Sequence, residues 1–184
     1  MRTRASNQPE RHTLGEGFYV QYKLQGQRNM SAKPVRVLLV SGRPGDAGSI
    51  RELSRDEAGG SLEITQVLSL EEALLQLTRD RFDLALLDLR LPDSQGLATL
   101  DTLREKSPDL AIVVVTGLAD EALGIEALRQ GAQDHLIEED LDGKLLVRSL
   151  RYSIERQRSR DELRQAALAA EAANGAKSEF LASM

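Results

Sequence analysis

From Val35 onward, short apolar runs alternate five times with amphipathic segments of helical length. A short, continuous apolar run is typical of a strand that is buried on both faces of a parallel sheet. The repeated alternation therefore predicts an α/β fold: a doubly wound, five-stranded parallel sheet with helices packed on it through right-handed crossovers. The order of the strands does not follow from this pattern. The expected strands are Val35–Val40, Leu62–Val67, Leu84–Asp88, Ala111–Thr116 and a short strand within 132–137.

Capping and turn residues delimit the expected helices. The first helix runs through Leu53, with Asp46 or Ser49 as its N-cap. Ser107-Pro108 ends one later helix, and Gly131 ends another. The remaining expected helices are Glu71–Arg79, Leu97–Lys106, Glu121–Gln130 with Asp120 as its cap, and a last helix that opens at Asp140 or Asp142.

Three segments follow one another along the chain. Residues 1–33 are polar, with one strand-like run at 18–20, and we expect a poorly ordered N-terminal extension. Residues 34–155 form the expected domain, and residues 156–184 continue the last helix beyond it. Because the short segment Met30-Ser31-Ala32-Lys33 directly precedes the first strong strand, we hypothesise that translation naturally starts at Met30. Mass spectrometry of the native N-terminus tests this hypothesis, and a peptide from residues 1–29 would refute it.

Composition narrows the possible chemistry. The chain has no cysteine, which excludes disulfides, thiolate catalysis and cysteine-based metal sites, and its two histidines are far apart in the sequence. A net charge of -5 argues against nucleic-acid binding by the whole chain. No apolar run is long enough for a membrane segment, and no signal peptide is visible. We therefore expect a cytoplasmic protein without a nucleic-acid partner.

The last expected helix carries two apolar patterns. Leu146, Leu150 and Ile154 share one face and can pack on the sheet. Beyond the charged stretch at 155–162, small or apolar residues recur at alternating spacings, as in a coiled-coil seam. The seam predicts a parallel homodimer through this helix; the alternative is a solvated single helix that frays in isolation. The seam residues are Leu163, Ala167, Ala170, Asn174, Lys177, Leu181 and Met184.

Asp88 is the side chain that the pattern singles out as a candidate site. It ends the apolar run that begins at Leu84, and the turn residues Pro92 and Gly96 follow it. Sites in open α/β sheets form in the crevice outside the carboxyl ends of the strands. A carboxylate at that place is either nucleophilic or metal-binding or, in the simpler interpretation, it caps a loop or starts a turn.

Several motifs together resemble the receiver domain of two-component response regulators, over roughly residues 34–155. They are Val-Arg-Val-Leu-Leu-Val at 35–40, Pro-Gly-Asp-Ala at 44–47, the whole segment 82–96, Val-Val-Val-Thr-Gly at 113–117 and Gly-Ala-Gln-Asp-His-Leu at 131–136. The resemblance implies the flavodoxin-like receiver fold and a function in two-component signal transduction. It also implies that Asp88 is the phosphoacceptor for a histidine kinase and that the Thr116 hydroxyl contacts the phosphoryl group.

Two charged elements of the family's site are missing. In that family an acidic pair after the first strand holds a divalent metal, and a lysine follows the fifth strand. The acidic-pair positions are Ser41 and Gly42 here, and the lysine position is Glu138. Phosphoryl transfer relies mostly on positioning and electrostatic stabilisation, and Mg²⁺ prefers oxygen ligands. At an effective dielectric near 20, unit charges about 4 Å apart interact by roughly 4 kcal/mol, so the reversed charge disfavours the phosphorylated form.

The departures from the family predict a degenerate receiver without a cofactor, with Mg²⁺ only where the site still functions. Asp46 is a possible substitute metal ligand, although a role as helix cap is favoured. Arg43 either supplies positive charge near Asp88 or faces solvent, and we expect solvent. His135 stands where the family usually has a switch aromatic that turns inward together with Thr116. The simpler interpretation of His135, which we favour, is a partly exposed edge histidine.

Ala-Lys-Ser-Glu-Phe-Leu-Ala-Ser-Met at 176–184 resembles the lead-in to the dimerisation and phosphotransfer helix of sensor histidine kinases. The resemblance implies the N-terminal side of a hybrid kinase, in which a histidine kinase core, in cis or in trans, is controlled through the paired helix. The catalytic part then lies beyond Met184, and the given residues are not an enzyme. The alternatives are a working receiver phosphorylated on Asp88 and an unrelated flavodoxin-like enzyme. The enzyme alternative is not supported, because the sequence contains neither a Gly-rich phosphate loop nor a nucleophile elbow.

Overall fold

The computed structural model describes residues 34–57 and 62–182, with side chains up to Asn174. The chain divides into two units, Met1–Lys33 and Pro34–Met184, and all described residues belong to the second. The predicted N-terminal extension, the start at Met30 and the side chains of the last seam residues therefore lie outside the described residues.

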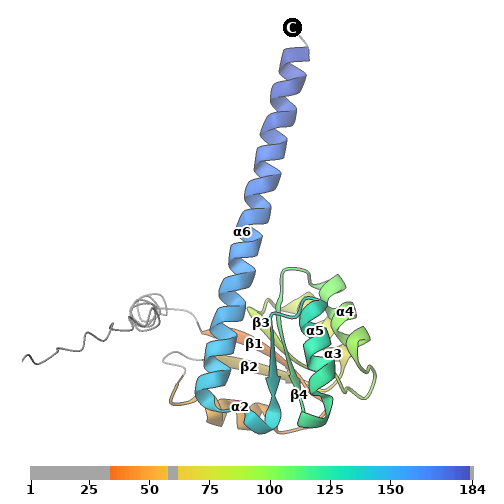
Figure 1. Ribbon diagram of the computed structural model, residues 1–184, viewed down its shortest axis with the longest axis vertical. Helices are drawn as coiled ribbons and strands as arrows, with labels where there is room; N and C mark the ends of the chain where they lie inside the picture. The colour runs from red at the N-terminus through yellow and green to blue at the C-terminus, as the bar shows by residue number, and fades with distance from the viewer. Residues whose placement is uncertain (1–33, 58–61, 183–184) are drawn as a thin grey trace, which may run out of the picture. The chain divides into compact units, whose positions relative to one another are not determined.

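Five parallel strands form one sheet in the order β2-β1-β3-β4-β5 (Figure 1). All five predicted strands are confirmed, and the last one is limited to the four residues from Asp134. The order, which the sequence pattern left open, places β1 between β2 and β3. The strands are β1 (Val35–Val40), β2 (Leu62–Val67), β3 (Leu84–Asp88), β4 (Ala111–Thr116) and β5 (Asp134–Ile137).

The helices that connect the strands follow the predicted bounds closely. Two short 3-10 turns, which the pattern did not predict, stand before the last two helices: η1 (Leu118–Asp120) and η2 (Glu138–Asp140). The α-helices within the described residues are α2 (Asp46–Ser54), α3 (Leu70–Arg79), α4 (Leu97–Lys106), α5 (Glu121–Arg129) and α6 (Gly143–Ala182).

The N-terminal caps differ from the predictions in two helices. α2 begins after Gly45, whose φ of 104° lies in the left-handed region that favours glycine, so the prediction of Asp46 or Ser49 as the cap was wrong. Asp120 stands at the N-cap of α5, but its side chain accepts no capping hydrogen bond. Asp142 does cap α6, because its Oδ1 accepts a backbone N–H of the first turn at 2.7 Å.

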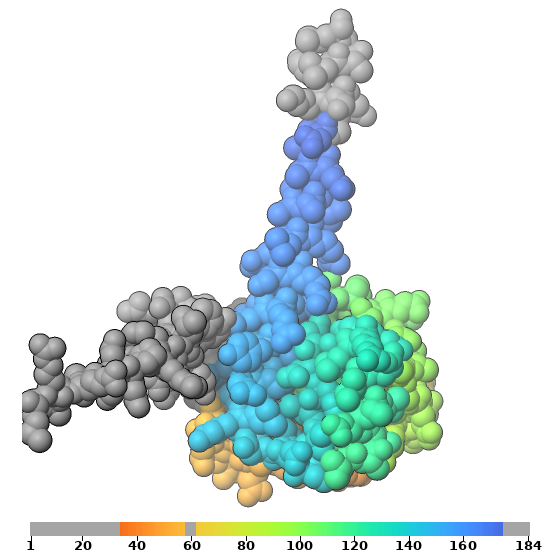
Figure 2. Space-filling view, in the orientation of Figure 1, coloured from red at the N-terminus to blue at the C-terminus, as the bar shows by residue number. Residues whose placement is uncertain are grey.

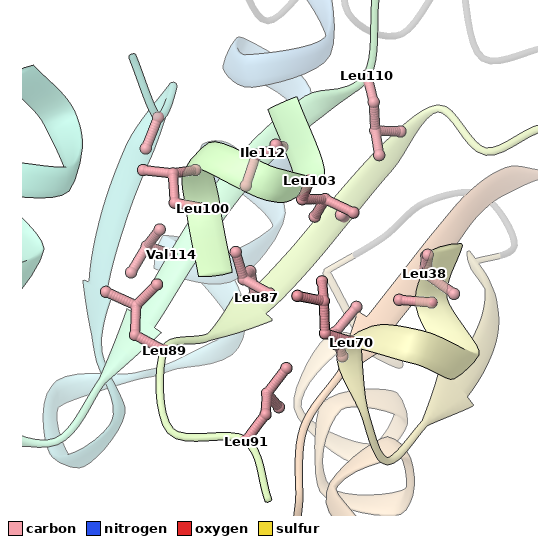
Figure 3. Close-up of a cluster of buried hydrophobic side chains, with 14 of the residues drawn as sticks. Leu38, Leu70, Leu87, Leu89, Leu91, Leu100, Leu103, Leu110, Ile112 and Val114 are labelled. Atoms are coloured by element: carbon pink, nitrogen blue, oxygen red, sulfur yellow. The ribbon is translucent and has the colours of Figure 1, made fainter. Parts of the chain in front are cut away.

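Each face of the sheet has its own apolar cluster. In β1, Leu38 and Val40 belong to one cluster, whereas Val37 and Leu39 belong to the other. α3, α4 and α5 cover the first face, and Figure 3 shows Leu38 in one cluster with Leu70 of α3 and Leu100 and Leu103 of α4. α2 and α6 cover the second, which we call the α6 face. The sheet is therefore doubly wound, as the sequence predicts.

The first part of α6 packs on the sheet. Leu146, Leu150 and Ile154 are buried in the cluster of the α6 face, which confirms the predicted apolar stripe. Gly143 lets the helix begin close to α2, since a Cβ at that position would overlap the carbonyl oxygen of Leu53. The helix thus starts beside α2 and lies across the sheet.

Beyond Ile154 the helix leaves the sheet. Gln157 is the last buried side chain in the described part of α6, and all side chains from Glu162 to Asn174 are exposed. Figure 2 shows this part of the helix projecting beyond the domain. At its base, Arg164 still reaches Asp109 at 2.6 Å. Leu163, the first residue of the predicted seam, is 72% exposed. Exposure of the seam does not test whether two helices pair, so the homodimer stays a prediction. No helix within the described residues combines the length and apolar character needed to cross a membrane.

Candidate functional site

The candidate site is a pocket of about 210 Å³ at the carboxyl ends of β1, β3 and β4. Strand order changes direction at β1, so this edge is the topological switch point at which open α/β sheets bind ligands. Gly42 and His135 do not line the pocket. The candidate site residues that do line it are Ser41, Arg43, Asp46, Asp88, Thr116 and Glu138.

Asp88 is the last residue of β3, and it is partly buried at the pocket. Its Oδ1 accepts the backbone N–H of Arg90 at 2.8 Å. Burial raises the pKa of Asp88, and this outweighs the opposing effects of that hydrogen bond and of the Arg90 and Arg43 charges. The nearby carboxylate of Glu138 adds to the rise in pKa. The position predicted for a phosphoacceptor therefore holds a carboxyl group whose charged form is disfavoured.

The two positions where a receiver usually carries acidic residues hold small side chains. Ser41 is buried, and its hydroxyl donates to the carboxylate of Asp46. Gly42 lies against the β3–α4 connection, where a Cβ would stand 3.3 Å from Cδ of Pro92. Neither position contributes a carboxylate. Asp46 is turned toward Ser41 and is not free in the pocket.

Arg43 links the loop after β1 to the loop after β5. Its Nη2 lies 2.7 Å from Oε1 of Glu138, and its Nε lies 3.4 Å from Oδ2 of Asp46. The hydrogen bond to Glu138 raises the pKa of Arg43. The expectation that Arg43 simply faces solvent is incomplete: its side chain is 55% exposed, but it also pairs with Glu138 and Asp46. Glu138 is 95 residues away in sequence, and its approach follows from the strand order. The guanidinium thus neutralises carboxylates on both sides.

Thr116, the last residue of β4, and His135, the second residue of β5, are brought together. Oγ1 of Thr116 and Nε2 of His135 are 2.7 Å apart. Burial lowers the pKa of His135, against the opposing effect of the Glu121 and Asp134 charges. The ring packs on α5 at Gly124, where a Cβ would overlap it. The favoured interpretation as an edge histidine is therefore incomplete: the ring is partly exposed but turned inward onto Thr116.

Two residues at this edge were not recognised from the sequence. Arg90 donates its backbone N–H to Asp88, and its Nη1 lies 3.2 Å from Oδ2 of Asp120. Glu139 accepts the backbone N–H of Leu118 at 2.9 Å, which ties η2 to η1. The only signal for Arg90 was its place two residues after Asp88; Glu139 had none, because its partner is distant in sequence.

Three carboxylates, those of Asp46, Asp88 and Glu138, line the pocket without converging on one point. In the part of the chain that the structure describes, no three His, Asp or Glu side chains lie close enough together to hold a metal ion. Arg43 engages both Asp46 and Glu138. The pocket therefore contains the partly buried carboxyl group of Asp88. Beside it, Arg43 neutralises the carboxylates of Asp46 and Glu138.

The match to known proteins agrees with this geometry. The response regulator receiver domain family matches residues 37–151, so the chain belongs to this family. It is therefore a receiver domain of two-component signal transduction with a long C-terminal helix, and the fold predicted from the resemblance is confirmed.

Three relatives illustrate the match. The regulatory protein LuxO of Vibrio cholerae is 43% identical over 76 residues, which are 41% of this chain and 17% of that protein. The C4-dicarboxylate transport transcriptional regulatory protein DctD of Rhizobium meliloti is 32% identical over 145 residues, which are 79% of this chain and 30% of that protein. The crystal structure of a sensor protein from Polaromonas sp. JS666 is 29% identical with a TM-score of 0.58, covering 68% of this chain and 99% of that one. The chain thus spans less than a third of the length of LuxO and of DctD.

Proposed function

We propose that this chain is a degenerate receiver that regulates a histidine kinase through α6 and does not rely on Mg²⁺-dependent phosphorylation. The observation that carries the proposal is the ion pair between Arg43 and Glu138 at the pocket. Relative to the pattern of the family, the charges are exchanged: the cation follows β1 and the anion follows β5.

The donor set does not fit Mg²⁺. This ion requires several oxygen ligands in near-octahedral geometry and usually binds through carboxylates. Ser41 already donates to Asp46, and the guanidinium of Arg43 lies beside the same carboxylate. Asp88 is left as the one carboxylate of the pocket without a guanidinium contact, and a single carboxylate holds a hard cation poorly.

A phosphoryl group on Asp88 would also meet unfavourable charge. Burial already disfavours one negative charge at Asp88, and Glu138 adds to that effect. A phosphoryl group brings further negative charge, so Arg43 would have to exchange Glu138 for the new group. These residues therefore support a receiver whose output does not depend on Asp88 phosphorylation.

α6 is the proposed output. It begins two residues after Leu141, which lines the pocket, and continues as one helix to Ala182. Leu163, Ala167 and Ala170 are exposed along it at coiled-coil spacing, which favours pairing with a second copy of the chain. Together with the resemblance of 176–184 to the lead-in of a kinase dimerisation helix, this supports a kinase core, in cis or in trans, as the regulated partner. One relative of known structure is itself described as a sensor protein.

A working receiver phosphorylated on Asp88 is the second candidate. It is favoured by the position of Asp88 and Thr116 in the same pocket, with the Arg43 and Arg90 charges acting on Asp88. In this candidate an arginine replaces the missing lysine and metal.

Acetyl phosphate with Mg²⁺, followed by intact-mass spectrometry, separates the two candidates. We expect no phosphoryl adduct on the wild-type chain. We expect an adduct on a variant with the family's charges, in which Ser41→Asp and Gly42→Asp are combined with Glu138→Lys. Asp88→Asn in that background is the matched control and should abolish the adduct. A stable, Asp88-dependent adduct on the wild-type chain would refute the degenerate receiver and support the second candidate.

Analytical ultracentrifugation tests the paired helix. We expect the chain to sediment as a dimer and the double variant Leu163→Glu, Ala167→Glu to sediment as a monomer, because charge in the seam opposes pairing. Leu168→Glu, on another face of the same helix, is the matched control and should leave the dimer intact. A monomeric wild-type chain at all concentrations would contradict pairing through α6.

A further inference from the structure

α6 leaves the domain at a buried polar contact. Gln157 and Gln133 are only 5% and 7% exposed. Nε2 of Gln133 donates to Oε1 of Gln157 at 2.8 Å, and Nε2 of Gln157 donates to the Pro108 carbonyl at 3.4 Å. Gln133 and Pro108 precede β5 and β4, so this contact lies at the sheet edge opposite the pocket.

Gln133 is itself held firmly by the sheet. Its backbone N–H donates to the Ile112 carbonyl at 2.8 Å, and its Oε1 accepts the Ile112 N–H at 2.6 Å. Because the backbone N–H and the Oε1 of Gln133 both bond to β4, its side-chain Nε2 is available to donate to Gln157. Because a buried amide that loses its partner keeps its desolvation penalty, the bonded arrangement is strongly preferred. The hydrogen bond therefore favours one rotational orientation of α6 relative to the sheet.

Gln157 also donates to Asp161, within α6, at 3.1 Å. Two ion pairs that tie this part of α6 to the domain are exposed. Arg158 pairs with Asp83 at 3.3 Å and Arg164 pairs with Asp109 at 2.6 Å, with side-chain exposures of 67% and 49% for the two arginines. Exposed ion pairs contribute little to stability. Gln157 is thus the contact best able to hold the helix where it leaves the sheet.

The contact also determines which face of α6 is free. Gln157 and Arg164 both touch the domain and lie on nearly the same line along the helix. At 3.6 residues per turn, the centre of the predicted seam, which includes Leu163 and Ala167, lies about 110° around the helix from that line. The seam residues accordingly lie to the side of the line that contacts the domain, and a rotation of α6 would change the direction in which they point.

We propose that the buried hydrogen bond between Gln133 and Gln157 is a rotational lock, which fixes the direction of α6 and the face that it presents to a second copy of the chain. The proposal rests on the proposed function in that α6 is taken as the output helix. Gln157 is a positioning residue: it acts on the free part of the helix and touches no partner itself.

Distances between two spin labels measure the direction of the helix directly. The chain has no cysteine, so Glu105→Cys in α4 and Glu171→Cys in α6, both exposed, provide labelling sites without background. Labelled chain is diluted with unlabelled chain so that the distance within one chain dominates. About 20 Å of helix separates Gln157 from Glu171, so a tilt of about 10° moves the second label by about 4 Å.

We expect one narrow distance distribution for the labelled parent. Gln157→Leu, which keeps the size of the side chain and removes its hydrogen bonds, should shift the mean by about 4 Å or more, or broaden the distribution about twofold. Gln165→Leu makes the same change on an exposed face of α6 and should leave the distribution unchanged. An unchanged distribution in Gln157→Leu, or a broad one in the parent, would overturn the proposal.

Two further variants keep the test decisive if Gln157→Leu folds poorly. Gln133→Leu removes the same bond from the other side, together with the bond to the Ile112 N–H. Gln157→Leu also removes the bonds to Pro108 and Asp161. Because the two substitutions share one interaction, the double variant should shift the label by less than the sum of the two single shifts. Arg164→Ala removes only an exposed ion pair and should retain the parental distribution. A full-sized shift in Arg164→Ala would assign the direction of the helix to the ion pair and refute the lock.

Failure of the lock and failure of the proposed function have different signatures. A monomeric chain whose label distance still depends on Gln157 contradicts the paired helix and leaves the lock in place. A dimeric chain whose label distance is insensitive to Gln157 refutes the lock and leaves the paired helix in place.

Discussion

At the scale of single residues, burial affects the ionisation of Asp88 more than the neighbouring arginines do. Burial raises its pKa, whereas the Arg90 N–H and the Arg90 and Arg43 charges lower it without compensating. A raised pKa means that the folded protein binds a proton more readily than the unfolded chain does. At a pH at which Asp88 is ionised in both the folded and the unfolded state, its negative charge therefore lowers the stability of the fold.

Asp88→Asn should therefore stabilise the domain at neutral pH. The amide keeps an oxygen for the Arg90 N–H, which Oδ1 accepts at 2.8 Å, and removes the charge. We expect a higher Tm than in the wild type near pH 7. The gain should shrink as pH falls below the folded pKa and vanish below the ordinary value of 3.8, where the aspartic acid is neutral in both states. Thermal unfolding followed by circular dichroism over this pH range measures the gain, and a lower Tm near pH 7 would contradict it.

Among the elements, α3 shows how a neighbouring loop completes a helix end. Ser69 accepts the backbone N–H of Glu72 at 3.1 Å, as an N-cap does. Asp93, from the β3–α4 connection, accepts the N–H groups of Leu70 and Glu71, each at 2.9 Å. The loop that follows the candidate site is thereby tied to the start of α3.

Asp93→Asn should weaken this connection in a pH-dependent manner. Desolvation acts to raise the pKa of Asp93, but the N–H groups of Glu71 and Leu70 lower it overall. Stabilisation by the carboxylate is therefore complete above the unfolded pKa and is lost as pH falls through the folded pKa. Because Asp93 is exposed, we expect a loss of only about 0.5–1 kcal/mol near pH 7, and no difference in acid where both side chains are neutral.

Urea denaturation at neutral and acidic pH measures the effect of Asp93→Asn. Asp101→Asn in α4, an exposed aspartate, is the control and should change little at either pH. A loss that is equal at both pH values would show that the charge of Asp93 does not contribute.

Across the whole molecule, α6 has two roles in one continuous helix. Its first part belongs to the core of the α6 face, through Leu146, Leu150 and Ile154. The part beyond Gln157 contributes no buried side chain up to Asn174. The same helix is therefore part of the fold at one end and free to contact a partner at the other.

Leu146→Ala should destabilise the domain by about 2–5 kcal/mol, since it leaves a cavity in a fully buried cluster. Leu163→Ala, in the exposed part of the same helix, should change the stability of the domain by no more than about 0.5 kcal/mol. Chemical denaturation at low protein concentration, followed by circular dichroism, compares the two variants. Equal losses would contradict the division of α6 into a core part and a free part.

Periodicity alone predicted most of the architecture. The apolar runs of β1, β3 and β4 are buried on both faces. Such strands can be recognised in a sequence because nearly every residue in them is apolar. The cap of α2 was missed because Gly45 acts through its backbone angle, which no side-chain pattern reports. Asp88 was found because a carboxylate at the end of a buried strand is unusual.

Local pattern determined the type of each element and the residues that are buried, because burial leaves a periodic trace in the sequence. The tertiary structure alone decided the strand order and the contacts that depend on it. Arg43 meets Glu138, and Gln133 meets Gln157, across separations of 95 and 24 residues. Polar side chains of this kind carry no periodic signal, and their partners are defined only when the sheet and α6 have assembled.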